Sequence, residues 1–195
     1  MPTRRIEAFS DAVIAILITV MVLELRIPHG QTWSTLRDSV PVLLTYLLSF
    51  VYLGIYWNNH HHLLMATKRV SGLVLWANLH LLFWLSLIPF TTGWLGENEF
   101  APAPAAAYGI VLMAAGLAYL LLQAAIIHLQ GEGSPLALAL GRDLKGKLSA
   151  ALYALGIGLA FVNRWLSVAI YVVAALLWLI PDRRLERTLS DASRD

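Results

Sequence analysis

Long apolar segments constrain this chain more than any other feature, because a helix needs about 20 apolar residues to cross the hydrocarbon core of a membrane. Six segments approach that length, at roughly 7–25, 39–57, 70–90, 104–127, 148–163 and 165–181. Only Asn163 and Arg164 separate the last two, which predicts a tight helical hairpin. We therefore expect an all-α integral membrane protein, with six transmembrane helices in one domain that spans residues 1–195.

The amino-acid composition agrees with a membrane protein and excludes other classes. The chain is 58% hydrophobic and only 13% charged, which is more apolar than soluble domains usually are. It contains no cysteine, so disulfides and thiolate metal sites are excluded. No small-residue cleavage site follows the first apolar run, so we expect no cleaved signal peptide. The net charge of +2 fits basic residues retained beside a membrane better than a nucleic-acid partner.

The positions of lysine and arginine predict the orientation in the membrane, because cytoplasmic loops carry an excess of both. With a cytoplasmic N-terminus, all but three of the 14 basic residues fall on the cytoplasmic side. The cytoplasmic set is Arg4, Arg5, Lys68, Arg69, Arg142, Lys145, Lys147, Arg183, Arg184, Arg187 and Arg194. The three exceptions are Arg26, Arg37 and Arg164. We therefore expect both termini inside the cell and a multi-pass protein of the cell membrane.

The first segment divides into two faces when it is drawn as a helix with 100° per residue. A nearly apolar stripe lies within about 60° of Ile16 and contains Arg5, Phe9, Ala12, Thr19 and Leu23. Asp11 lies about 140° from Ile16, and Ser10 lies about 120° away on the other flank. A charge facing lipid is costly, so we expect Asp11 to face the body of the protein and to anchor this helix. Its candidate partners are Arg5, His60, His61 and His62.

Other polar residues inside the apolar segments also need partners, because an unpaired polar group in lipid is costly. Asn78 and His80 lie in the third segment, where we expect hydrogen bonds between helices. The run His60–His62 suggests a metal site at first sight, but neighbouring residues on a helix do not face one another. We therefore expect no metal site and no cofactor, and we keep these three histidines and His80 as candidate partners of the first helix.

Three motifs give the chain a resemblance to a known family. Arg5, Phe9, Ser10 and Asp11 form the pattern R-x-x-x-F-S-D, which resembles the signature of the transmembrane protein 175 family of potassium channels. The stretch FSDAVIAILITVMVLELRIP is similar to the first helix of that family. The stretches YWNNHHHLL and NLHLLFWLSLIPFTTGWLGE, which begin at Tyr56 and Asn78, are similar to its second and third helices. The resemblance extends over the whole chain, as a single six-helix unit of the prokaryotic kind.

The resemblance implies a homotetramer with four copies of the first helix around a central pore. In that family an apolar side chain five positions after the motif aspartate forms the constriction, which corresponds to Ile16 here. A Thr or similar layer follows at Thr19 and a further apolar layer at Leu23, and Ala12 lies on the same stripe. The implied partners are potassium ions, the lipid bilayer and further copies of the chain.

Three classes of function remain open from the sequence alone. The first, which we favour, is a channel with a moderate preference for potassium. It has no TVGYG filter, so selectivity would come from partial dehydration at a hydrophobic constriction. The second is an intramembrane enzyme that uses Asp11 and the histidine run. The third is a small secondary transporter, although inverted repeats and helices broken near mid-membrane are not evident. A closed ring of subunits would favour the channel, and an active monomer the enzyme.

Overall fold

The computed structural model describes residues 3–25, 27–29, 32–67, 69–131, 133–140 and 144–179. Within these ranges all regular structure is helical, which confirms the all-α class. The elements are α1 (Thr3–Leu23), the 3₁₀ helix η1 (Trp33–Ser39), α2 (Val40–Met65), α3 (Gly72–Ser86), α4 (Ile88–Glu97), α5 (Pro102–Gln130), α6 (Pro135–Leu140), α7 (Leu144–Ala160) and α8 (Arg164–Leu179). Some of the basic residues used to predict the orientation lie outside the described residues: Arg26, Lys68, Arg142, Arg183, Arg184, Arg187 and Arg194.

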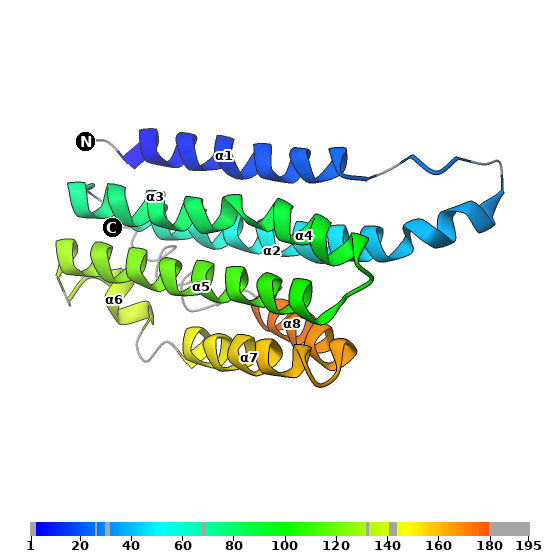
Figure 1. Ribbon diagram of the computed structural model, residues 1–195. Coiled ribbons are helices and arrows are strands. Elements are labelled where there is room, and N and C mark those ends of the chain that lie inside the picture. The colour runs from blue at the N-terminus through cyan, green and yellow to red at the C-terminus, as the bar shows by residue number, and fades with distance from the viewer. Residues whose placement is uncertain are drawn as a thin grey trace.

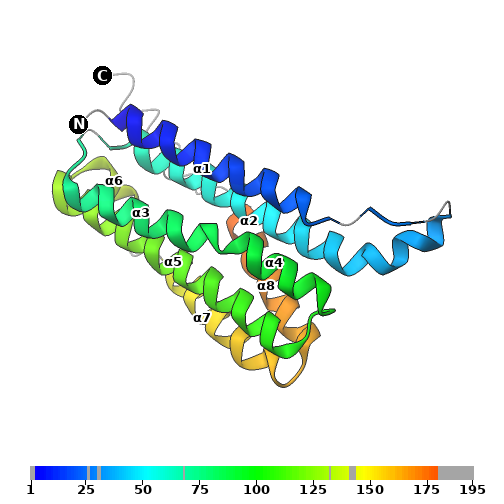
Figure 2. The same cartoon turned by 45° about the horizontal axis from the view of Figure 1, so that its top comes forward.

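The helices form a bundle in which α3 and α4 continue in one direction, and α1, α2, the α3–α4 pair, α5, α7 and α8 each run opposite to the one before (Figure 1). Helix α1 lies along one side of the bundle, over α2 and the α3–α4 pair. Helix α5 packs against α3 and α4 on one side and against α7 and α8 on the other. The turned view in Figure 2 agrees that α1 and the α7–α8 hairpin occupy opposite sides of the molecule. Among the described residues, helix α1 therefore has neighbours on one side only.

Four helical stretches of the described chain are long and apolar enough to cross a membrane: Thr3–Leu23, Trp33–Met65, Gly72–Glu97 and Pro102–Gln130. They coincide with the first four predicted segments. The fifth and sixth segments coincide with α7 and α8, which have only 17 and 16 residues. The hairpin between these two helices is present, and Asn163 Oδ1 accepts hydrogen bonds from the backbone N–H groups of Trp165 and Leu166. Six crossings stay a prediction.

Helix α2 continues well past the predicted end at residue 57 and includes the histidine run. The polar side chains there form hydrogen bonds with backbone carbonyls of the same helix or with neighbouring helices, so they do not end the helix. Asn59 Nδ2 donates to the Ile55 carbonyl at 2.8 Å. His62 Nδ1 donates to the Asn58 carbonyl at 2.7 Å, one turn back. The predicted end of this helix was too early, because a run of polar residues such as the one after Trp57 is typical of a helix end.

The third predicted segment, 70–90, also ends too early, because the helix resumes as α4 and runs to Glu97. The break between α3 and α4 falls at Leu87, two residues before Pro89. A proline lacks the N–H that would continue the ladder, and it clashes with the carbonyl four residues back. Beyond the break, the hydroxyls of Thr91 and Thr92 donate to backbone carbonyls one turn earlier. The threonines therefore belong to a buried helix and not to a loop.

Buried hydroxyls join the helices in the middle of the bundle. Ser49 Oγ of α2 lies 2.6 Å from Thr92 Oγ1 of α4 and 2.9 Å from Tyr108 Oη of α5. Tyr52 Oη donates to the Tyr171 carbonyl of α8 at 2.6 Å. In a membrane such groups must be satisfied inside the protein, and hydrogen bonds between helices do so here. This central network fixes α2, α4, α5 and α8 relative to one another.

We predict that Gly109→Ala lowers the stability of the bundle. The Tyr171 hydroxyl donates to the Ala105 carbonyl at 3.0 Å, and a methyl group on Gly109 would collide with that hydroxyl. Overpacking of this kind costs about 1–3 kcal/mol. Thermal unfolding of the detergent-solubilised protein measures the loss. Gly54→Ala is the control, because a methyl group there meets nothing within 4 Å. Equal melting temperatures for the two variants would contradict the prediction.

Candidate pore-lining face of α1 and its anchor

Helix α1 packs on the bundle through one line of side chains. The buried residues are Ile6, Ser10, Ile14, Leu17 and Met21. Their spacing of three or four positions is that of a single helix face. Ser10 is the polar member of this line and is fully buried. The contact with α2, α3 and α4 is therefore centred on the flank that carries Ser10.

Ser10 connects α1 to α2 and α3 through a chain of hydrogen bonds. Asn78 Nδ2 of α3 donates to Ser10 Oγ at 3.0 Å, and Ser10 Oγ donates to the Ile6 carbonyl at 2.8 Å. Asn78 Oδ1 lies 2.7 Å from His60 Nε2 of α2, which donates when that nitrogen carries the proton. The side chains of Ser10, Asn78 and His60 are all buried. In such surroundings a complete network is strong and an incomplete one is costly.

A second contact between α1 and α2 lies one turn closer to the N-terminus. Glu7 Oε1 of α1 is 2.9 Å from His61 Nδ1 of α2, and both side chains are partly exposed. His62 bonds within its own helix, and His80 Nε2 accepts a hydrogen bond from Trp84 Nε1 at 3.0 Å. Of the four candidate histidines, His61 thus reaches α1 directly and His60 reaches it through Asn78. The other two do not.

Asp11 is half-buried, but it lacks the hydrogen-bonded partner that we expected. Its Oδ1 atom is buried and forms no hydrogen bond in the described part of the chain. Arg5 is exposed, and the three neighbouring histidines bond elsewhere. The reason is geometric, since the buried face of α1 is centred on Ser10 and turns Asp11 to its edge. The charges of Asp11 and Glu7 nevertheless act electrostatically on His60.

The stripe around Ile16 is exposed from end to end in a single copy. Phe9 is 52% exposed, Ile16 58% and Leu23 83%. The remaining members are also exposed: Arg5, Ala12 and Thr19. Thr19 Oγ1 donates to the Ile16 carbonyl at 2.8 Å, so its proton is used within the helix and its lone pairs stay available. Copies of this face could enclose a narrow path with apolar levels and one level of oxygen atoms.

The similarity to known proteins extends over both the stripe and the anchor of α1, which is the hydrogen-bonded set Ser10, Asn78 and His60. The family described as "Endosomal/lysosomal potassium channel TMEM175" matches residues 5–89. A potassium channel of Chryseobacterium sp. is 49% identical over 187 residues, which cover 96% of this chain and 97% of that protein. The chain belongs to the TMEM175 family. A potassium channel of Streptomyces collinus is 33% identical over 190 residues, covering 89% of this chain and 90% of that protein.

The TMEM175 fold is also seen in a solved structure. The crystal structure of a "lysosomal potassium-selective channel TMEM175 homolog" from Chamaesiphon minutus matches with a TM-score of 0.78 at 28% identity. The match covers 92% of this chain and 97% of that chain. The resemblance read from the three sequence motifs is therefore confirmed. Because the family and these relatives are ion channels, this TMEM175-family chain is not an enzyme.

Two parts of the anchor were absent from the predicted site of this TMEM175-family chain. Glu7 was not singled out, because a charged residue in the first turns of a membrane helix is ordinary. Asn78 was expected only to find some partner in another helix. The signal for Glu7 is its position on α1 opposite the exposed stripe. The signal for Asn78 is a polar side chain in the middle of the apolar helix α3. Among the described residues, no group of three or more His, Asp or Glu side chains is placed to hold a metal ion.

We predict that Ser10→Ala weakens the attachment of α1. The change leaves Asn78 Nδ2 without its buried acceptor, and an unsatisfied buried group costs about 1–3 kcal/mol. Thermal unfolding of the solubilised protein, followed together with its oligomeric state, measures the effect. Ser86→Ala is the matched control, because Ser86 on α3 is exposed and bonds only within its own helix. A Ser10→Ala protein as heat-resistant as the control would show that this network does not hold α1.

Proposed function

We propose that the chain forms a homotetrameric cation channel with a moderate preference for potassium, in which four copies of α1 surround a central pore. The observation that carries this proposal is the exposed stripe of Phe9, Ile16 and Leu23 on a helix whose opposite face is firmly packed. The relatives named as potassium channels support the choice of ion.

A ring of copies follows from the position of α1. The helix lies at one side of the bundle, away from the α7–α8 hairpin (Figure 1). One helix cannot enclose a path for ions, so each copy must meet others around a rotation axis. The anchor through Ser10 and Asn78 sets the rotation of α1 about its own axis. That rotation decides which side chains reach the centre of the ring.

The narrowest level of the proposed pore is a ring of Ile16 side chains. A hydrophobic ring of this kind closes by excluding water, so no charged plug is needed. Leu23 adds a second apolar level toward the end of α1, and Ala12 leaves more room on the N-terminal side of Ile16. Opening requires the α1 helices to rotate or to move apart until hydrated ions pass.

Selectivity in such a pore rests on the cost of removing water from the ion. Sodium is smaller than potassium and holds its water more tightly, so partial dehydration at Ile16 penalises sodium more. Thr19 lies three residues further along the same stripe, and its oxygen lone pairs can replace part of the lost water. Because this replacement is partial, the preference for potassium is moderate. It is weaker than in a filter of stacked carbonyl groups.

We further propose six membrane crossings with both termini in the cytoplasm, in the cell membrane. Helix α7 has 17 residues and α8 has 16, which corresponds to about 25 Å at 1.5 Å per residue. A hydrocarbon core is about 30 Å thick, and local thinning accommodates a shorter helix at modest cost. The basic residues on the predicted cytoplasmic side, such as Lys145 and Lys147, support this orientation.

Asp11 is assigned a structural role beside the pore. It belongs to the motif of Arg5, Phe9 and Ser10, yet it is half-buried away from the centre of the stripe. Its charge acts on His60, which is part of the Ser10 anchor. At the edge of the buried face, Asp11 contributes to the position of α1 beside the hydrogen bonds that its neighbour Ser10 makes. We therefore place Asp11 outside the ion path.

Flux measurements on purified protein in liposomes test the proposal. Potassium and sodium should both move down their gradients without a co-substrate, with potassium moving faster. The assembly should have four times the 21.6 kDa mass of the chain. A secondary transporter would instead require a coupled ion or substrate. Conduction by a monomer, or strictly coupled transport, would overturn the proposal.

A further inference from the structure

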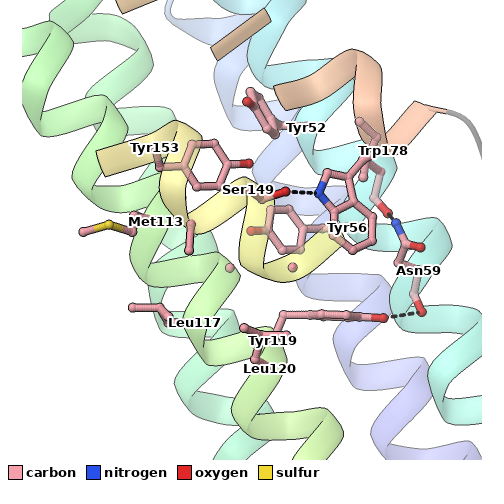
Figure 3. Close-up of a pocket in the computed structure, with 14 residues that line it drawn as sticks. Tyr52, Tyr56, Asn59, Met113, Leu117, Tyr119, Leu120, Ser149, Tyr153 and Trp178 are labelled. Atoms are coloured by element: carbon pink, nitrogen blue, oxygen red, sulfur yellow. Dashed lines mark hydrogen bonds between the residues drawn. The ribbon is translucent and has the colours of Figure 1, made fainter. Parts of the chain in front are cut away.

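A cavity that is distinct from the α1 stripe lies between α2, α5, α7 and α8. Figure 3 shows its aromatic walls, which include Tyr56, Tyr119, Tyr153 and Trp178. The cavity is narrow, with a free volume of about 40 Å³. Among the described residues, no charged side chain lines it. The cavity is therefore a largely apolar space that opens to the outside of the helix bundle.

The cavity extends from the middle of the bundle, at Tyr52 and Gly116, toward the end that holds the N-terminus. Asn59 is in the last two turns of α2, Ser149 is in the second turn of α7, and Trp178 is in the last turn of α8. Mixed aromatic and polar residues at helix ends are typical of the membrane–water interface. An occupant that enters from this interface would place its polar end near Asn59 and Trp178. Its apolar end would point toward Tyr153 and the middle of the membrane.

One polar atom in this cavity needs a partner. Ser149 Oγ accepts from Trp178 Nε1 at 2.7 Å, and Tyr119 Oη donates to the Asn59 carbonyl at 3.1 Å. The Tyr56 side chain is only 9% exposed and points into the cavity (Figure 3). Its hydroxyl forms no hydrogen bond among the described residues. An occupant with a hydrogen-bond acceptor at this depth would pair with it, whereas an occupant without one would remove the hydroxyl from water at a cost.

The mouth of the cavity carries a positive charge. Lys145 Nζ lies 6.0 Å from the centre of the Trp178 ring, which is one wall of the cavity. Lys145 is one helical turn before Ser149, which corresponds to about 6 Å along α7. It is also in the first turn of α7, where the helix dipole favours an anion. A negatively charged group at the mouth would lie beside the Lys145 side chain and the first turn of α7.

We propose that this cavity binds an anionic glycerophospholipid. One acyl chain occupies the apolar space, an ester carbonyl accepts the hydrogen bond of Tyr56, and the phosphate lies beside Lys145. Lipid surrounds the bundle in the proposed membrane placement. An acyl chain is narrow enough to enter a cavity between packed helices. The lipid bridges α2 to the α7–α8 hairpin. This inference rests on the membrane placement proposed above, but it does not depend on ion conduction.

Lipid binding to the purified full chain tests the proposal, with native mass spectrometry as the readout. The probes are diacyl phosphatidylglycerol, its dialkyl ether analogue and phosphatidylcholine. Wild type should bind the diacyl form about fivefold more tightly than the ether analogue, as one hydrogen bond implies. Tyr56→Phe should abolish that difference. Tyr46→Phe, on the same helix but outside the cavity, should preserve it.

The charge and the cavity are tested separately. Lys145→Gln should weaken phosphatidylglycerol binding about fivefold, with a smaller effect on phosphatidylcholine. Lys147→Gln is its matched control, because Lys147 is exposed and it is Lys145 that lies over the Trp178 ring. Ala150→Leu fills the cavity and should reduce binding of both lipids, whereas Ala154→Leu, one turn further on at an exposed position, should not.

Each contrary result overturns the proposal in a distinct way. Unchanged binding in Ala150→Leu would show that lipid only surrounds the bundle. Equal preference for ester and ether lipids in wild type would remove Tyr56 from the site. Competition by inorganic phosphate without any effect of the acyl chain would indicate an anion site only. Tyr56→Phe keeps the ring in place and Lys145→Gln adds no bulk, so both variants stay informative if Ala150→Leu does not fold. If the protein conducts no ions, the proposed function is contradicted, but the lipid-binding results remain valid.

Discussion

Replacing Ile16 with asparagine is expected to raise basal ion flux and to weaken discrimination against sodium. If four Ile16 side chains form the constriction, a polar residue of similar size lets water enter and ions pass more fully hydrated. Lowering the barrier by about 1.4 kcal/mol is enough for a tenfold rise in rate. Flux from liposomes without any activating condition measures the first effect. Reversal potentials under a potassium–sodium gradient measure the second.

Val22→Asn is the control for this experiment. Val22 is on the same helix and is 46% exposed, but it lies about 120° around the helix from Ile16. The same chemical change there should leave basal flux near the wild-type value. If Ile16→Asn conducts no better than Val22→Asn, the narrowest level of the pore is not at Ile16.

The two faces of α1 could be predicted because they depend on local periodicity alone. A step of 100° per residue places Phe9, Ile16 and Leu23 together, and all three are exposed in the structure. Apolar length likewise predicted where the main helices lie. The boundaries were less accurate, because Pro89 and the polar run after Trp57 resemble helix ends while their neighbours keep the backbone helical.

The anchor could not be predicted in full, because it depends on where other helices pack. Ser10 and Asp11 lie on opposite flanks, about 120° and 140° from Ile16, so the helical wheel cannot choose between them. The charge of Asp11 made it the more noticeable residue. The structure places Asn78 of α3 beside Ser10, across 68 positions of sequence. Only tertiary packing brings those two residues together.

The cavity beside Tyr56 also could not be predicted from the sequence. Its walls come from α2, α5, α7 and α8, and each contributes side chains that would also suit an ordinary core. Tyr56 itself lies in a motif that was used only for the resemblance. What marks the site is an unpaired hydroxyl and a lysine beside Trp178, and both require coordinates to be recognised.

Replacing Thr19 with alanine is expected to reduce the preference for potassium while the closed state persists. The variant removes one hydroxyl per subunit from the stripe but leaves the proposed ring of Ile16 side chains intact. In wild type the Thr19 proton is held by the Ile16 carbonyl, so the oxygen can face a passing cation. Loss of that oxygen should lower the potassium-to-sodium permeability ratio about fivefold, the effect of roughly 1 kcal/mol of lost interaction.

Reversal potentials distinguish this effect from that of Ile16→Asn, because basal flux should stay low in Thr19→Ala. Thr19→Ser is the matched control, since it keeps the hydroxyl and loses only a methyl group, and it should retain most of the selectivity. If the control loses as much selectivity as Thr19→Ala, packing of the methyl group matters and the oxygen does not. Equal selectivity in wild type, Ile16→Asn and Thr19→Ala would mean that ions do not pass along this face of α1 at all.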